Sequence, residues 1–499
     1  MNNEIPASFS ACGDFCVILQ HRYIATIVLG SHIRVFAIVF IDRQIIFIAM
    51  ENEEKACSEQ QIEKLYEIFL RHPEVSTDSR DCPAGAIFFA LKGDKFNGNK
   101  YAAMALEQGC SCAVVDEAEY AIAGDDRYFL VPDALTALQQ LAHHHREQFN
   151  IPVLQITGTN GKTTTKELVS AVLARKHNVL STQGNFNNHI GVPKTLLRLR
   201  PEHAIAVIET GANHPGEIRT LAEIVDPTAG LITNVGVAHI EGFGSFEGVV
   251  KTKGELFDYM RHNSRGFVFL NADNPHLVRI SKGLLPVTYG QPGKGYFIEG
   301  EVVDCSPYLR LRWRKGNMCM WEDPWHEVQT HLVGAYNLTN CLAAACVGNR
   351  YGVDVDDISQ ALQDYCPTNN RSELTRTATN MLVIDAYNAN PSSMNAALDN
   401  FALMTPPDNM TKMLILGDMK ELGAISEQEH RRILDKLTAL NFSDVWLVGS
   451  NFASLNPPFP TFQNVDEVKA RLRETPVNNR LILIKGSNST RLFELPQLL

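Results

Sequence analysis

The residues best suited to chemistry lie at positions 154–167, where the chain reads LQITGTNGKTTTKE. Glycine, lysine and threonine in this order, between an apolar run and a helical pattern, are typical of a loop that binds phosphate. The strict form of that loop has glycine five residues before the Gly-Lys pair, and Ile156 occupies that position here. The sequence therefore predicts a variant phosphate loop, with an ordinary strand–turn–helix corner as the alternative.

The flanking residues favour the phosphate loop. Val153 to Ile156 are apolar and predict a buried strand, and apolar side chains then recur at helical spacing between Leu168 and Leu173. Backbone N–H groups at a helix start lack intrahelical partners and lie at the positive end of the helix dipole, so they attract a polyphosphate. Lys162 would add a cation, and the Thr163 hydroxyl would add a magnesium ligand.

Two further candidates follow apolar runs. Glu209 ends the run AIAVIE, so its carboxylate is expected at the carboxyl end of a strand. There it would suit a magnesium ion that bridges phosphates, and a helix-capping or solvent-facing acid is the alternative. His239 ends LITNVGVAH. Isolated histidines are mostly surface or core groups, but Asn234 and the nearby glycines would let the backbone approach a ligand closely.

Two other stretches allow more than one interpretation. In VVKTKGELF, Lys251 and Lys253 lie two residues apart, and a solvated helix start is the simpler interpretation. In GNFNNHIGVPKTLL, three asparagines, Asn185, Asn187 and Asn188, surround a glycine turn. Their amides suit a sugar or peptide ligand, and they suit a turn equally well.

The elements that must position these residues alternate between strands and helices. Short apolar runs at 87–91, 112–115 and 128–131 indicate one small domain, and runs at 153–156, 204–209 and 229–234 begin a second. Strand and helix patterns alternate again from about residue 370 to the end. This alternation predicts parallel sheets that bind ligands beyond the carboxyl ends of their strands. We therefore expect an α/β protein of three domains, at 50–150, 151–366 and 367–499.

Composition excludes several classes of protein. The chain has 499 residues, 45% of them hydrophobic and 20% charged, which are values typical of globular domains. A formal net charge of −11 argues against a nucleic-acid-binding surface. The 11 cysteines contain no C-x-x-C pair, which favours reduced thiols in a cytosol over disulfides or zinc. Cys110 and Cys112 are expected to alternate along one strand.

Residues 1–49 form an extension that precedes the first predicted domain. The segment is apolar, but Arg34, Asp42 and Arg43 interrupt it before any run reaches the ~18 residues that a membrane span needs. Three interpretations compete: a membrane-associating segment, an additional strand-rich piece, or sequence upstream of a native start at Met50. We favour the third, because a helix with a Ser58–Gln61 capping box follows directly. Mass spectrometry of the native N-terminus tests this hypothesis.

Together, these motifs resemble those of the Mur ligases, the ATP-dependent amide-forming enzymes of peptidoglycan precursor synthesis. The resemblance runs from about residue 73 to the end. Its ordered motifs are TGTNGKTTTKE, GNFNNHIGVPKTLLRL, ETGANHPGEI, NVGVAHIEGFGSFEGVVKTKGE, NADN, DAYNANPSSM and LGDMKELG. It implies a UDP-binding first domain, a P-loop ATPase-like central domain and a Rossmann-like C-terminal domain.

The resemblance implies an ATP site with two magnesium ions. The loop would bind nucleotide through Gly158, Thr159, Asn160, Gly161, Lys162, Thr163 and Thr164. Thr163 and Glu209 would bind one ion. His239 and Lys253, the latter carbamylated by CO₂, would bind the other, which reverses the solvated interpretation of Lys253.

Further roles follow from the same resemblance. Asn271 would lie near adenine, Asp385 on the ribose side, and Arg371 at the γ-phosphate. Arg371 follows TNN where the family usually has Pro-Gly before arginine, so the chain departs from the family pattern at this position. Ser79 and Arg80 would bind the UDP end of the substrate. The remaining substrate-binding candidates are Asn185, Asn187, Asn188, Asn388 and Asn390.

Within the family, the motifs are most similar to those of ligases that add D-alanyl-D-alanine to UDP-N-acetylmuramoyl-tripeptide through an acyl phosphate. The resemblance implies a cytoplasmic monomer without membrane insertion. The alternatives are the ligase that adds the third amino acid, a folylpolyglutamate synthase, or a nucleotide-binding module without catalysis. Against the first, the third domain lacks an Asp-Asn-Pro-Arg signature. Nothing in the sequence identifies the third residue of the tripeptide.

Overall fold

The computed structural model of this chain describes the backbone of residues 15–19, 22–29, 32–41 and 44–46, and both backbone and side chains of residues 55–263, 266–316, 323–367, 373–407 and 409–499. The chain divides into two compact units, Met1–Leu141 and Ala142–Leu499. The three domains expected from the sequence, including a boundary near residue 366 inside the second unit, stay a prediction.

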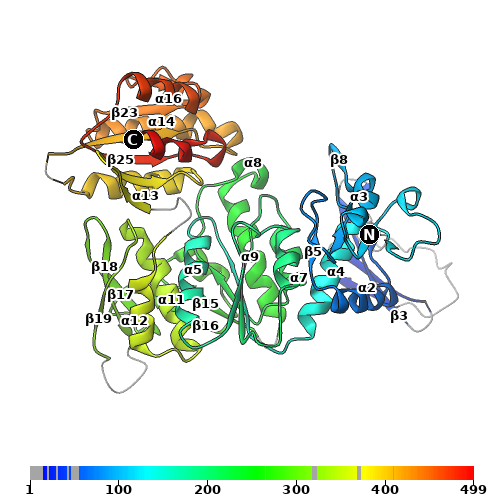
Figure 1. The fold of residues 1–499 in the computed structure, drawn as a ribbon. Helices are drawn as coiled ribbons and strands as arrows, with labels where there is room; N and C mark the ends of the chain where they lie inside the picture. Colours follow the sequence, from blue (N-terminus) through cyan, green and yellow to red (C-terminus); the bar gives the residue numbers. More distant parts are fainter. Residues whose placement is uncertain are drawn as a thin grey trace, which may run out of the picture. The chain divides into compact units, whose positions relative to one another are not determined.

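The first unit begins with four antiparallel strands that pair in chain order. They are β1 (Phe15–Leu19), β2 (Arg22–Leu29), β3 (His32–Ile41) and β4 (Gln44–Ile46). Figure 1 draws this part of the chain in dark blue and labels β3. These strands agree with the strand-rich interpretation of the extension, and the proposed start at Met50 stays a prediction. No helix among the described residues is long and apolar enough to cross a membrane.

The rest of the first unit is a small α/β domain. Its sheet has the order β10-β9-β6-β5, and all pairs are parallel. Helix α2 begins at the predicted capping box, since Ser58 and Gln61 cap each other. Cys112 lies in β9, but Cys110 does not, because its N–H donates to Ala105 O at 3.0 Å and closes the preceding helix. The prediction that both cysteines belong to one strand is therefore wrong.

The remaining elements of the first unit are α2 (Glu59–Arg71), β5 (Val75–Ser76), β6 (Ile87–Phe89), β7 (Lys92–Gly93), β8 (Phe96–Asn97), α3 (Ala102–Glu107), β9 (Cys112–Val115) and β10 (Tyr128–Leu130). Helix α4 (Ala134–Glu147) runs across the boundary between the units.

A nine-stranded central sheet dominates the second unit, with the order β12-β13-β11-β14-β15-β16-β17-β18-β19. Its strands from β12 to β17 are parallel, as the sequence predicts. β18 and β19 add an antiparallel extension that the alternation of strands and helices did not indicate. The strands are β11 (Val153–Thr157), β12 (Val179–Ser181), β13 (Ile205–Glu209), β14 (Ala229–Ile232), β15 (Phe267–Asn271), β16 (Pro286–Gly290), β17 (Ile298–Cys305), β18 (Leu309–Lys315) and β19 (His326–Gln329).

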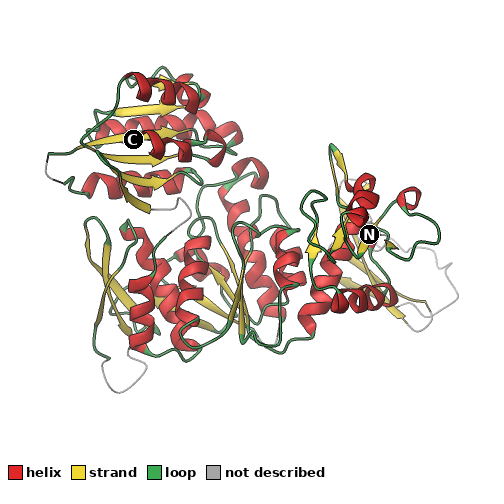
Figure 2. Ribbon diagram, in the orientation of Figure 1, coloured by secondary structure: helices red, strands yellow, loops and turns green. Residues whose placement is uncertain are grey.

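Helices cover both faces of the central sheet, and each face has its own apolar core (Figure 2). One core joins the sheet to α5 (Lys162–Leu173), α11 (Leu338–Arg350) and α12 (Val355–Asp364). The other joins it to α7 (Glu217–Val225), α9 (Phe246–His262) and α10 (Pro275–Ile280). The shorter helices are α6 (Gly191–Leu196) and α8 (Ile240–Phe243).

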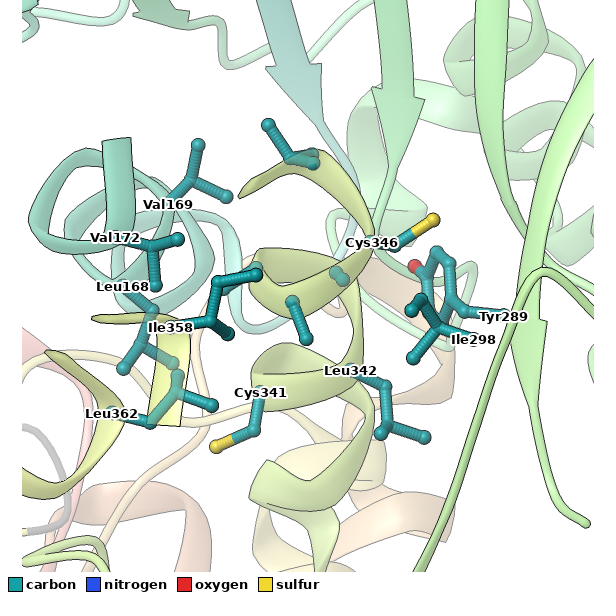
Figure 3. Close-up of a cluster of buried hydrophobic side chains, with 14 of the residues drawn as sticks. Leu168, Val169, Val172, Tyr289, Ile298, Cys341, Leu342, Cys346, Ile358 and Leu362 are labelled. Carbon is teal, nitrogen blue, oxygen red and sulfur yellow. The ribbon is translucent and has the colours of Figure 1, made fainter. Parts of the chain in front are cut away.

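Helix α11 occupies the centre of the first core. Figure 3 shows its Leu342 and Cys346 beside Tyr289 and Ile298 of the sheet. Its other side faces α5 so closely that a Cβ on Gly348 would lie 2.3 Å from Val172 Cγ1. Burial of this kind contributes roughly 25 cal/mol per Å² of apolar surface, so α11 fixes the helix that follows the predicted phosphate loop.

The last part of the second unit is a Rossmann-like layer built on a six-stranded sheet of order β20-β21-β25-β22-β23-β24. All pairs are parallel except β20–β21. Every strand and helix that the sequence predicts here is present, with ends shifted by a few residues. The elements are β20 (Glu373–Arg376), β21 (Met381–Asp385), α13 (Pro391–Leu403), β22 (Thr411–Gly417), α14 (Ser426–Ala439), β23 (Val445–Val448), α15 (Ser450–Ala453), β24 (Thr461–Phe462), α16 (Val465–Glu474) and β25 (Arg480–Lys485).

Candidate active site

Three adjacent strands of the central sheet bring the predicted residues together. β11 pairs in parallel with β13 on one side and β14 on the other, so that Ile156 lies opposite Glu209 and Thr157 opposite Ile232. Parallel strands end at the same edge of a sheet. The loop after β11, Glu209 at the end of β13 and Asn234 just after β14 therefore share one edge.

The loop itself is fixed by hydrogen bonds from its neighbour. Thr159 N–H donates to Asn234 O at 2.9 Å, and Asn160 N–H donates to Asn234 Oδ1 at 3.0 Å. Gly158 has φ +145°, and a Cβ there would lie 2.0 Å from Thr233 Oγ1. Only glycine fits this position without displacing Thr233. The strict phosphate loop requires glycine at the position of Ile156, whereas this variant loop requires it at 158.

Lys162 and Thr164 lie in the first turn of α5, after Gly161, whose φ is +75°. The Lys162 ammonium donates to Gly158 O at 2.9 Å and Thr159 O at 3.2 Å, so it is held against the loop. A helix start with a lysine over its loop provides N–H donors and positive charge to a phosphate chain. The prediction that the turn opens a helix is confirmed.

Glu209 is only 1% exposed, and its two carboxylate oxygens differ. Oε1 accepts hydrogen bonds from Thr163 Oγ1 at 3.1 Å and from Asn187 Nδ2 at 2.8 Å. Oε2 is buried and has no hydrogen-bond partner among the residues that the structure describes. A buried carboxylate oxygen without a partner is costly, and a divalent cation would satisfy it. The donor set at this point therefore fits magnesium.

The protein contributes few ligands to such an ion. Within the described part of the chain, no three His, Cys, Asp or Glu side chains form a cluster that could hold a metal. Magnesium is commonly bound by one or two carboxylates together with substrate phosphates and water. Thr163 and Glu209 match that sparse pattern.

Lys253 lies in the middle of α9 and is 2% exposed, so the solvated helix start expected from the sequence is wrong for this residue, although Lys251 is exposed. Its ammonium donates to Ala212 O at 3.2 Å and lies 5.3 Å from the centre of the Phe243 ring. Burial, assisted by the positive charge of Lys162, lowers the pKa of Lys253 to about 7. The helix turns this position toward the sheet, which the lysine spacing alone did not reveal.

His239 packs on the same aromatic ring as Lys253. The His239 and Phe243 rings meet edge to face with centroids 6.2 Å apart. His239 has φ +51° and precedes α8, and its Nδ1 pairs with Glu421 Oε2 from the loop after β22. This contact with His239 holds the pKa of Glu421 below its ordinary value.

The asparagine cluster separates into different roles. Asn188 Oδ1 accepts from Ile190 N–H and Gly191 N–H, so it builds the turn before α6. Asn187 instead donates to Glu209, as described above, and Asn185 is exposed. One asparagine thus supports the turn interpretation, and another lies in the candidate site.

The C-terminal candidates gather at the carboxyl edge of their own sheet. Asp385 Oδ2 accepts from Lys485 Nζ at 2.6 Å, and the same ammonium donates to Asn388 O at 3.1 Å. Asn390 caps α13 and donates from Nδ2 to Asn160 Oδ1 of the phosphate loop at 2.8 Å. The turn that contains Asp385, Asn388 and Asn390 is therefore tied both to β25 and to the loop.

The other candidates lie elsewhere. Asn271 ends β15 and accepts from Asp273 N–H at 3.1 Å. In the first unit, Ser79 is buried, and Arg80 forms a bidentate pair with Asp78 at 2.9 and 2.7 Å. Arg371 lies outside the described residues.

Sequence reasoning missed a buried amide relay behind the loop. Thr165 Oγ1 donates to Asn340 Oδ1 at 3.1 Å, and Asn340 Nδ2 donates to Asn337 Oδ1 at 2.9 Å. It also missed Ser392, whose Oγ accepts from Val237 N–H, and Lys485. A polar residue within an apolar helix (Asn340) and a charge at the end of an apolar run (Lys485) were the available signals.

Three family models match consecutive parts of the chain. They are the Mur ligase family, catalytic domain, at residues 73–146; the Mur ligase middle domain, at 156–348; and the Mur ligase, glutamate ligase domain, at 370–488.

Named relatives and a solved structure agree with these models. The chain is 35% identical to the UDP-N-acetylmuramoyl-tripeptide–D-alanyl-D-alanine ligase of Haemophilus influenzae, over 77% of this chain and 82% of that protein. It is 34% identical to the ligase of the same name from Escherichia coli, over 84% and 92%. The crystal structure of MurF from Acinetobacter baumannii superposes with a TM-score of 0.77 and 28% identity, over 88% of this chain and 98% of that one. Since relatives above 30% identity align along most of their length, this chain belongs to the Mur ligase family.

Proposed function

We propose that this protein joins D-alanyl-D-alanine to UDP-N-acetylmuramoyl-tripeptide at the expense of ATP, which completes the UDP-linked pentapeptide used for peptidoglycan. The observation that carries the choice of substrates is the match to relatives of that name, at 34% and 35% identity along most of both chains. The phosphate loop beside a buried carboxylate supports the use of ATP. The monomeric state and cytoplasmic location implied by the resemblance stay predictions.

The reaction needs an activated carboxylate, because a carboxylate ion is a poor electrophile. A carboxylate oxygen of the tripeptide attacks the γ-phosphorus of ATP, the bond to the ADP oxygen breaks, and an acyl phosphate forms. The amine of the dipeptide then attacks the acyl carbon, the bond to phosphate breaks, and phosphate and a proton leave. In the first step two anions approach each other, so positive charge must be held at the γ-phosphate.

Lys162 is the residue proposed to hold that charge. In this structure its ammonium is bound by two loop carbonyls, Gly158 O and Thr159 O, which a polyphosphate in the loop would replace as partners. Arg371 is the second cation proposed from the resemblance. The C-terminal sheet approaches the loop through Asn390 and Ser392, so residues of that sheet can contribute to the site.

Magnesium, when bound, would neutralise phosphate charge, and the residues proposed to hold it form two pairs. Thr163 and Glu209 are one pair, supported by the unpartnered Glu209 Oε2. His239 and Lys253 are the other, with Lys253 converted to a carbamate. Only a neutral amine reacts with CO₂, and burial disfavours the charged form of Lys253, because the contacts with Ala212 O and the Phe243 ring replace water only in part.

The decisive experiment measures phosphate release from ATP and magnesium in the presence of UDP-N-acetylmuramoyl-tripeptide, with and without D-alanyl-D-alanine. The proposal predicts release that requires both substrates, and a product heavier than the tripeptide substrate by one dipeptide less water. Release that proceeds equally without the dipeptide, or with glutamate or a diamino acid in its place, would refute the proposed acceptor. If both substrates are required, a comparison of the rates with tripeptide substrates that end in lysine or in another diamino acid would identify the third residue.

A further inference from the structure

The carboxylate of Glu421 reaches the candidate site from the C-terminal sheet. Glu421 lies in the loop after β22 and pairs with Nδ1 of His239, which precedes α8 in the central part of the chain. A second bond accompanies the pair, since Glu241 N–H donates to Glu421 O at 3.3 Å. Gly423 also packs on Glu241, because a Cβ there would lie 3.3 Å from Glu241 Cβ. The loop therefore holds both the side chain of His239 and the turn that follows it.

The backbone at both ends of this pair is unusual. His239 has φ +51° and Glu421 has φ +62°, and neither is glycine. Left-handed conformations are unfavourable at such residues and persist where surrounding contacts require them. Two such residues that face each other across an ion pair indicate that the placement of the imidazole is specified from both sides.

A histidine binds one metal ion through one ring nitrogen. The contact made by the second ring nitrogen sets the tautomer, and the tautomer determines which nitrogen keeps a lone pair for the metal. When Nδ1–H donates to a carboxylate, Nε2 keeps its lone pair and the ring orientation is fixed. Glu421 places a carboxylate at ion-pair distance from Nδ1 of His239. The Phe243 ring restricts the imidazole from the side that it shares with Lys253.

We propose that Glu421 is a positioning residue that orients His239, so that Nε2 is presented to the second divalent cation. The inference rests on the proposed function in assigning His239 to a cation. Glu421 lies in a loop of the C-terminal layer, whereas Lys253 of α9 and Glu209 of β13 belong to the central sheet and its helices. The second cation should therefore bind at full strength only when this loop contacts His239.

The test compares divalent-cation binding in the full-length protein and three variants, Glu421→Ala, Glu421→Gln and Glu421→Asp. Mn²⁺ is titrated in the presence of a non-hydrolysable ATP analogue, and free Mn²⁺ is followed by electron paramagnetic resonance. Glu427→Gln is the matched control, because Glu427 lies on the same domain, is 73% exposed and pairs only with Arg431 among the described ion pairs. Phosphate release with both substrates is measured in parallel.

The proposal predicts about a 10–100-fold loss of affinity for the weaker Mn²⁺ in Glu421→Ala, with a similar fall in kcat and little change in the KM for the UDP substrate. Glu421→Gln keeps an acceptor without the charge and should lose less, and Glu421→Asp should recover part of the loss. A purely structural role would lower the melting temperature and leave Mn²⁺ affinity unchanged.

Wild-type Mn²⁺ affinity in Glu421→Ala and Glu421→Gln, with Glu427→Gln also unchanged, would overturn the inference. The outcome is independent of the proposed reaction. If the wild-type protein released no phosphate with the dipeptide, the proposed function would fail, while the Mn²⁺ titration would still decide whether Glu421 supports a cation site.

Discussion

Glu209 and Lys253 are ionisable residues that the fold buries almost completely, at 1% and 2% exposure. Burial of an ionised group costs several kcal/mol unless partners replace water. Among the described residues, Glu209 has hydrogen-bond partners for one oxygen only, and Lys253 contacts one carbonyl and one aromatic face. Glu209 therefore has acceptor capacity that the described residues do not satisfy, as expected of a cation ligand. Lys253 would have to lose its charge and become a carbamate before it could bind a cation.

Glu209→Gln should lower kcat/KM by on the order of 100-fold and raise the magnesium concentration needed for half-maximal rate. The amide oxygen can still accept the two hydrogen bonds from Thr163 and Asn187, so the fold should persist while the anionic ligand is lost. Phosphate release at varied magnesium checks this, with the exposed Glu202→Gln as control. An unchanged magnesium dependence would rule out Glu209 as a ligand.

Lys253→Ala should lose turnover, and small carboxylic acids should restore part of it, because they can occupy the place of the carbamate. Phosphate release with and without added acetate or formate is the measurement. Lys251→Ala, two residues earlier on the exposed face of α9, should keep wild-type activity and show no response to the acids. Absence of any rescue in Lys253→Ala would argue against a carbamate at this position.

At the scale of elements, the site depends on how α5 is held against α11. Gly348 of α11 allows this close approach. Asn340, nearer the N-terminal end of α11, accepts a hydrogen bond from Thr165 of α5. The helix that carries Lys162 and Thr163 is thereby fixed along its length, from its first turn to Val172. The phosphate loop is then held by Asn234, just after β14.

Gly348→Ala should destabilise the protein, because the new methyl group would overlap Val172 Cγ1. Overpacking of a core costs about 1–3 kcal/mol, which exceeds the roughly 1 kcal/mol that alanine gains over glycine in a helix. Urea unfolding followed by circular dichroism measures the change. Combined with Val172→Ala, the substitution should be less harmful than the sum of the single changes. If Gly348→Ala alone were as stable as the wild type, α5 and α11 would be able to move apart at little cost.

At the scale of the whole molecule, the second unit brings together the carboxyl edges of two sheets. Asn390 meets Asn160, Ser392 meets Val237, and Glu421 meets His239. The phosphate loop and the proposed second cation ligand are therefore both in contact with the sheet that follows residue 373. Ligand binding at the loop should stabilise the unit that contains these contacts.

A non-hydrolysable ATP analogue with magnesium should raise the melting temperature of the protein. A ligand at 100 times its Kd contributes about 2.7 kcal/mol to the folded state. Calorimetric scans with and without the analogue provide the measurement. Lys162→Ala should remove most of the shift, whereas Lys282→Ala, an exposed lysine of the same unit, should not. An equal shift in Lys162→Ala would contradict the assignment of this lysine to the nucleotide.

The sequence by itself determined the α/β class, the loop and helix at 154–173, and the strand ends that carry Glu209 and Asp385, since periodicity and turn residues are local properties of the chain. The family resemblance then supplied roles that no local pattern contained. The burial of Lys253, the partner of each asparagine, the antiparallel strands β18 and β19, and the pairing of His239 with Glu421 were decided by the tertiary structure. These features depend on which faces and edges meet after folding, and residues 182 positions apart, such as His239 and Glu421, leave no mark of their contact in the local sequence.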